Sequence, residues 1–143
     1  MRIALGILSV LFGSVIWFGQ IISSINYEFA TKVGLQEPMS ETDPLFQRAE
    51  LNTARWDCVA MWTILAAGIL MLFNNSWWPY LALIAGGVYI DTGGREIAKV
   101  ASLKAEGVRA GSAKDSILRW IVFSLMILGG LCLIVAAIYV RAR

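Results

Sequence analysis

The sequence predicts an all-α integral membrane protein, a four-helix antiparallel bundle forming one transmembrane domain over residues 1–143. Two observations lead to this fold class. First, 58% of the residues are hydrophobic and 15% are charged, and the mean hydropathy is +0.68, so the chain has more apolar surface than a soluble domain of this size can bury. Second, four apolar runs each approach the ~20 residues that cross a hydrocarbon core of about 30 Å.

The four spans are delimited by the charges and polar turns between them. They cover about residues 3–25, 55–73, 77–96 and 117–140. The first run has no internal charge and is longer than the ~7–15 apolar residues of a signal peptide, so we expect a retained anchor. The second run ends at the polar turn Asn74, Asn75 and Ser76, which is too short to separate domains.

Local signals predict where the helices begin and end. Asp43 followed by Pro44 is typical of an N-cap and a first helical position, so the second helix should begin well before the membrane. The third helix should continue past its span until Gly107. Ser112 with Asp115 is a capping-box pattern and predicts the start of the fourth helix. We expect irregular backbone only before Pro44 and in the short link after Gly107.

Several function classes are excluded by what the sequence lacks. It contains no histidine, which removes imidazole metal sites, histidine-ligated haem and every catalytic pair that uses histidine. Cys58 and Cys132 do not form a CxxC pair, so no zinc or redox motif is indicated. The net charge of +2 is small and dispersed, which argues against a nucleic-acid partner. We therefore predict no cofactor and no metal site.

The basic residues predict an orientation in the plasma membrane. A four-span chain has both termini and the Asn74 turn on one side, which carries three basic residues: Arg2, Arg141 and Arg143. The other side carries nine: Lys32, Arg48, Arg55, Arg95, Lys99, Lys104, Arg109, Lys114 and Arg119. The positive-inside rule then places the two longer connections in the cytoplasm and the termini outside.

Polar residues inside the predicted spans form a layer at one depth. Measured from the Asn74 turn at the helical rise, Asp57 lies roughly 25 Å and Asp91 roughly 22 Å along their helices. Arg55 and Arg95 reach a similar level, and so does Gln20 of the first span. Charges at such positions persist when another group compensates them. The sequence therefore predicts a polar layer near the cytoplasmic interface.

This layer is the candidate ligand site. Asp91 precedes Arg95 by four residues on one helical face, where the two can pair, and Asp57 with Arg55 could close a network across helices. The predicted ligand-binding residues are Asp57, Asp91, Arg95, Arg55, Gln20, Tyr89 and Trp56. They would bind a hydrophobic or cationic small ligand, with the aromatic side chains as walls. The alternative is that these groups only cap the bundle and snorkel toward water.

Glycine pairs in the third span indicate close helix packing. Gly86, Gly87, Gly93 and Gly94 recur at seven-residue intervals. Small residues let helix backbones approach each other. We expect this stripe to pack within the bundle rather than to form a dimer seam.

Three segments also resemble a known group of proteins. They are ELNTARWD at residues 50–57, AGGVYIDTGGREIAKV at residues 85–100 and AEG at residues 105–107. In these segments the chain resembles a group of small uncharacterised bacterial four-helix integral membrane proteins of unknown function. Asp91 departs from the mostly apolar pattern of that group. The resemblance implies the fold and a bacterial membrane location, and it implies no activity.

Three functions are compatible with the sequence. We favour a small polytopic membrane protein that acts as a non-enzymatic ligand-binding or accessory subunit, in contact with membrane lipids and with a possible homo-oligomeric or larger membrane partner. A channel or transporter for a small solute would need several copies, because four helices rarely enclose a path. A membrane-embedded acid–base enzyme acting on a lipid would use two of the aspartates. No catalytic residue is assigned.

Overall fold

The fold is all-helical over the part of the chain that the computed structural model describes, residues 2–141 without the side chains of residues 113 and 115. The elements are α1 (Arg2–Ile25), α2 (Tyr27–Lys32), the 3₁₀ helix η1 (Met39–Glu41), α3 (Pro44–Ala60), α4 (Trp62–Leu72), α5 (Trp78–Ala105) and α6 (Ala113–Arg141). No strand is found among these residues. The predicted all-α class is confirmed.

Three helical segments of the described chain are long and apolar enough to cross a membrane. They are Arg2–Ile25, Pro44–Leu72 and Ser116–Arg141. They contain the predicted spans 3–25 and 117–140, and they cover the predicted span 55–73 up to Leu72. The predicted span 77–96 corresponds to the first part of α5, which begins at Trp78 and has 28 residues. The helix α5 is not one of the three segments, and it carries Asp91, Arg95, Glu96 and Lys99.

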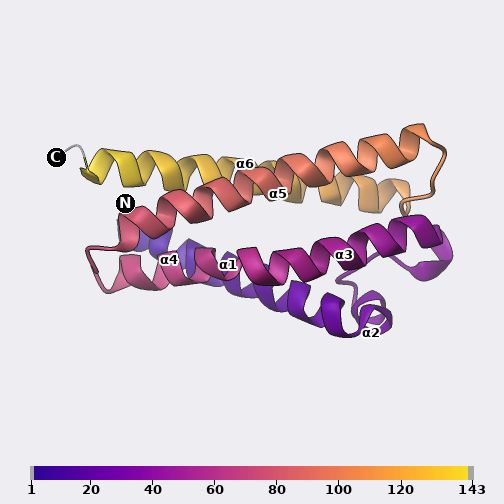
Figure 1. The fold of residues 1–143 in the computed structure, drawn as a ribbon, viewed down its shortest axis with the longest axis horizontal. Helices are drawn as coiled ribbons and strands as arrows, with labels where there is room; N and C mark the ends of the chain where they lie inside the picture. Colours follow the sequence, from indigo (N-terminus) through magenta and orange to yellow (C-terminus); the bar gives the residue numbers. More distant parts are fainter. Residues whose placement is uncertain (1, 142–143) are drawn as a thin grey trace.

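The long helices form two antiparallel pairs (Figure 1). In one pair α1 packs against α3 and α4, in the other α5 packs against α6, and the pairs meet along α4 and α5. Both labelled termini and the turn between α4 and α5 lie at one end, and α2 and the link between α5 and α6 lie at the other. Within the described residues α1 and α6 share no extensive contact, so the ring of four helices is open on that side.

Most predicted helix boundaries are confirmed. Pro44 is the first residue of α3, and α6 begins directly after Ser112. α5 ends at Ala105, and Gly107 follows with φ +79°, a left-handed conformation that favours glycine. The side chain of Asp115 in the predicted capping box lies outside the described residues.

Two expectations about backbone structure were wrong. The stretch before Pro44 contains α2 and η1, and α2 begins where the side chain of Asn26 accepts a hydrogen bond from the Phe29 backbone at 2.9 Å. The second helix is also not continuous, because Met61 separates α3 from α4.

The main hydrophobic core lies in the half of the molecule that contains the α4–α5 turn. The buried members of this core are Met61, Ile64, Ala67, Met71, Trp78, Ala82, Ala85, Tyr89, Met126, Leu133 and Ala137. Glycine brings the α5 and α6 backbones together, as predicted. A Cβ atom on Gly86 would lie 2.7 Å from the Gly130 carbonyl, and one on Gly93 would lie 2.8 Å from the Phe123 carbonyl. Gly87 and Gly94 face open space.

A polar clasp joins the two pairs at the opposite end. Arg109 donates to the Asp43 carboxylate from its backbone N–H at 2.7 Å and from Nε at 2.9 Å. The Asp43 backbone N–H in turn donates to the Arg109 carbonyl at 3.0 Å, and Thr42 forms an isolated bridge with Ala110. Asp43 occupies the N-cap position, but its side chain makes no cap bond. The hydrogen bonds from the Arg109 backbone and then its side chain lower the pKa of Asp43.

Candidate functional site

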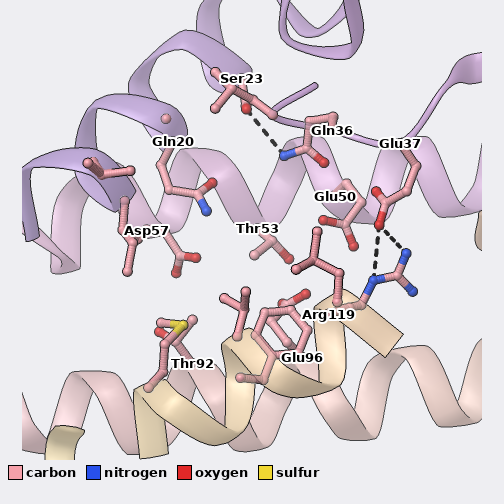
Figure 2. A pocket seen from close by; sticks show the side chains of 18 of the residues that line it. Gln20, Ser23, Gln36, Glu37, Glu50, Thr53, Asp57, Thr92, Glu96 and Arg119 are labelled. Carbon is pink, nitrogen blue, oxygen red and sulfur yellow. Dashed lines mark hydrogen bonds and ion pairs between the residues drawn. The ribbon is translucent and has the colours of Figure 1, made fainter. Parts of the chain in front are cut away.

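A cavity of about 510 Å³ lies between the two helix pairs, in the half of the molecule that contains α2. Figure 2 shows it from close by, with α1 and α3 above and α5 and α6 below. The loop 34–38 after α2 crosses one end of the cavity, and Met61 and Met126 of the apolar core border it at the other. The cavity therefore does not continue into the core toward the α4–α5 turn.

The lining divides into a polar side and an apolar side. Polar side chains come mainly from α3, α5 and the loop: Gln20, Ser23, Thr31, Gln36, Glu37, Glu50, Thr53, Asp57, Thr92, Glu96 and Arg119. Apolar side chains come mainly from α1 and α6: Val15, Ile16, Leu35, Met61, Leu118, Val122, Phe123 and Met126. A molecule in this cavity would contact hydrogen-bonding side chains on one side and apolar side chains on the other.

Asp57 is the deepest charged residue of the site. It is fully buried on α3, and Arg95 Nη2 of α5 donates to its Oδ1 atom at 2.7 Å. The second carboxylate oxygen, Oδ2, is buried and has no hydrogen-bond partner. This pair joins α3 to α5 at the floor of the cavity, and it leaves one acceptor unused.

A second group of charges lies one to two turns closer to the loop. Lys99 Nζ of α5 lies 2.8 Å from Glu50 Oε1 of α3 and 2.5 Å from Glu96 Oε2 of its own helix. Lys99 also donates to the Thr53 hydroxyl at 3.0 Å. Glu96 is 3% exposed, and its Oε1 atom has no partner. One lysine is therefore shared between two carboxylates, of which Glu96 is buried and Glu50 is partly exposed.

Two polar contacts hold the loop across the end of the cavity. Arg119 of α6 forms an ion pair with Glu37 and donates to the Ala110 carbonyl at 2.8 Å. Gln36 donates to the Ser23 hydroxyl of α1 at 3.2 Å. Both pairs are visible in Figure 2. The loop thus connects α1 to α6 at the point where these helices do not pack against each other.

The structure brings together some of the predicted site residues. Asp57 and Gln20 line the cavity, and Arg95, which is not part of the lining, donates a hydrogen bond to Asp57. Gln20 directs its side-chain amide toward the cavity in Figure 2, and its Oε1 atom is buried without a partner. Three of the predicted residues, one each on α1, α3 and α5, therefore lie at or beside the cavity.

Other predicted site residues lie elsewhere. Arg55 and Trp56 are exposed on the outer face of α3, and Asp91 is exposed on α5. The expected pairs of Asp91 with Arg95 and of Asp57 with Arg55 were wrong. Arg95 pairs with Asp57 instead, between α5 and α3. Tyr89 is 6% exposed within the apolar core and does not line the cavity.

Five charged residues of the site were not among the predicted site residues: Glu37, Glu50, Glu96, Lys99 and Arg119. A periodic signal was present for most of them. Residues 50, 53 and 57 recur at helical spacing on one face of α3, and residues 92, 96 and 99 do so on α5. These two polar stripes at helical spacing would have indicated that α3 and α5 face each other.

Over the described residues no three side chains of the metal-binding types His, Cys, Asp and Glu come close enough together to hold a metal ion.

Neither family models nor curated proteins nor solved structures gave a match to this chain. The resemblance to small bacterial four-helix membrane proteins thus stays a prediction.

Proposed function

We propose that this chain is a multi-pass plasma-membrane protein that binds a small amphipathic molecule in the cavity between its helix pairs. In this proposal it acts as a non-enzymatic binding or accessory subunit, and α5 completes a four-span antiparallel bundle. The observation that carries the proposal is the two-sided lining. Small-molecule sites are about 300–1,000 Å³ in volume, mostly apolar, and contain a few directed polar groups, and the cavity of about 510 Å³ fits this description.

The charge pairs on α5 support its crossing the membrane. A charged side chain in a hydrocarbon core costs a few kcal/mol, about 2.5–3.5 on insertion scales, and is tolerated when it is paired and faces the bundle interior. Arg95 is paired with Asp57, and Lys99 is paired with Glu50 and Glu96. With α5 as a span, the termini share one side, in line with the nine-to-three distribution of basic residues.

Binding is better supported than transport or catalysis. The apolar core between Met61 and the α4–α5 turn leaves no continuation of the cavity through a single copy of the chain. The carboxylates that an acid–base enzyme would use each have a cation against them. Such charge-assisted pairs fix the side chains in place and suit a fixed recognition surface.

Native mass spectrometry of the gently solubilised protein tests the proposal, since one spectrum reports bound molecules, copy number and retained partner chains. The sharp comparison is Gly19→Phe against Gly87→Phe. Gly19 lines the cavity, and an added Cβ there makes only an ordinary contact with Leu35 at 3.7 Å. Gly87 faces open space on α5. We expect a stoichiometric adduct in the wild type and in Gly87→Phe, and its loss in Gly19→Phe. An adduct that persists in folded Gly19→Phe would refute the proposal.

A further inference from the structure

We infer that the molecule bound in this cavity carries an ammonium group on an alkyl chain, and that the free oxygens of Asp57, Glu96 and Gln20 receive that group. This inference rests on the proposed binding function and adds the chemical class of the ligand. Three separate observations support it: the kind of unpartnered atom in the cavity, the balance of charge around it, and the apolar side on which α1 and α6 stand apart.

Among the described residues that line the cavity, four buried side-chain atoms have no hydrogen-bond partner. Three are acceptors on α1, α3 and α5, and the fourth is the donor Nη1 of Arg119 on α6, whose guanidinium pairs with Glu37. Asp57 Oδ2, Glu96 Oε1 and Gln20 Oε1 are buried and lack hydrogen-bond partners. Asp57 is 0% and Glu96 is 3% exposed, so bulk water does not solvate these carboxylates. A buried acceptor without a donor costs free energy. A ligand that places N–H donors among these three oxygens would remove that cost.

By formal charge, the groups around the cavity include one carboxylate in excess. Glu37 pairs with Arg119, and Asp57 pairs with Arg95. Glu50 and Glu96 share Lys99 as their one cation, so four carboxylates face three cations. A cationic ligand balances this cluster, whereas an anionic headgroup would meet uncompensated like charge in a low-dielectric site.

The apolar side of the cavity suits an alkyl chain. Its α1 wall contains Val15 and Ile16, and its α6 wall contains Leu118, Val122 and Phe123. Within the described residues these two helices share no extensive contact, so a chain lying between them would reach the surrounding lipid. The ammonium could belong to a single-chain amine or to the headgroup of a phospholipid. The recognition chemistry is the same for both.

Competition between matched probes tests the inference. We would measure retention of dodecylamine, dodecanol and dodecyl phosphate by native mass spectrometry, because the three share a chain and differ in the headgroup. An ammonium bound to carboxylates makes charge-assisted hydrogen bonds that the alcohol lacks. We expect dodecylamine retention at least about tenfold above that of dodecanol, and no retention of dodecyl phosphate. Equal retention of amine and alcohol would overturn the inference.

Glu96→Gln is the decisive variant, since Lys99 keeps Glu50 as its partner at 2.8 Å and the cluster becomes neutral. It should reduce dodecylamine retention about tenfold and leave dodecanol unchanged. Asp91→Asn makes the same charge change on the same helix at an exposed position, and it should change neither. Unchanged amine retention in Glu96→Gln would contradict the inference. If Glu96→Gln does not fold, Gln20→Met removes one acceptor at constant charge and should also weaken amine retention.

Two further arms separate the possible explanations. Phosphatidylethanolamine that displaces dodecylamine would identify a phospholipid as the source of the ammonium group, and failure to displace it would identify a single-chain amine. The Gly19→Phe variant tests the cavity itself. If it abolishes binding of all probes while amine and alcohol bind the wild type equally, the binding function stands and the ammonium assignment fails.

Discussion

The guanidinium of Arg95 on α5 lies 2.7 Å from the carboxylate of Asp57 on α3 and connects the two helix pairs at the floor of the cavity. The two side chains differ in their environment, because 1% of the Asp57 side chain is exposed and 32% of that of Arg95. Loss of the arginine would leave a buried anion, whereas loss of the aspartate would leave a cation that reaches the surface. The two partners are therefore not equivalent.

We predict that Arg95→Gln destabilises the protein more than Asp57→Asn does. Breaking a fully buried ion pair costs about 3–5 kcal/mol through the charge that is left behind. Arg95→Gln should approach about 3 kcal/mol, and Asp57→Asn should cost about 1–2 kcal/mol because the remaining guanidinium is partly solvated. Thermal unfolding in one detergent measures both. The double variant Asp57→Asn/Arg95→Gln should be more stable than Arg95→Gln alone, and a strictly additive loss would contradict this account.

The clasp between Asp43 and Arg109 predicts an acid-dependent loss of stability. The folded-state pKa of Asp43 is lowered, so its contribution is complete above the unfolded value of about 3.9. The contribution is lost as the pH falls from there through the folded value. The difference in Tm between the wild type and Asp43→Asn should have its full size at pH 6 and should become smaller below about pH 4.

The same comparison in 1 M salt is the control for the clasp. Arg109 is 65% exposed at its side chain, and exposed charge pairs are screened by salt. The Tm difference at pH 6 should therefore become smaller in high salt. A difference that stays the same from pH 6 to pH 3 would show that the carboxylate charge of Asp43 does not contribute.

Neighbouring glycines on α5 should respond in opposite ways to alanine. An added Cβ on Gly93 meets the Phe123 carbonyl at 2.8 Å, so Gly93→Ala should separate α5 from α6 and cost about 1–3 kcal/mol. Gly94 has open space around it, so Gly94→Ala should be neutral or stabilise the helix by up to about 1 kcal/mol. Equal effects of the two substitutions in thermal unfolding would refute the packing of α5 on α6.

Reporter fusions test the proposed membrane crossing of α5. A reporter inserted in the Asn74 turn and one after the C-terminus should both be outside the cell, and one in the link after Gly107 should be cytoplasmic. This result follows only if α5 crosses between the turn and the link. A turn and a link on the same side would show that α5 does not span the membrane.

The sequence predicted the long helices, and it placed three residues of the cavity region at similar positions along them, because both inferences depend on composition along one chain. Charges bounded the apolar runs, Pro44 and Gly107 marked helix boundaries, and Asp57, Arg95 and Gln20 were placed at one level. These features follow from chain geometry and from the preferences of single residues. They do not require knowledge of which helix faces meet.

The facing residues were harder to predict. Asp91 and Glu96 are both acidic residues on α5, but Asp91 is exposed and Glu96 is buried beside Lys99. Their roles depend on the rotation of α5, which is fixed by Gly86 and Gly93 packing against α6. The position of Glu37 over the cavity was not predictable, because an irregular loop has no periodicity from which its course can be read.

Photo-crosslinking with a diazirine-bearing alkylamine tests the central claim most directly. The probe is bound to the protein in detergent, and crosslinked peptides are mapped with and without excess dodecylamine. We predict competed crosslinks to the cavity walls, at residues 15–19 of α1 and 118–126 of α6. Crosslinks spread evenly over the exposed faces of α1 and α6, and unaffected by the competitor, would contradict a binding cavity between the helix pairs.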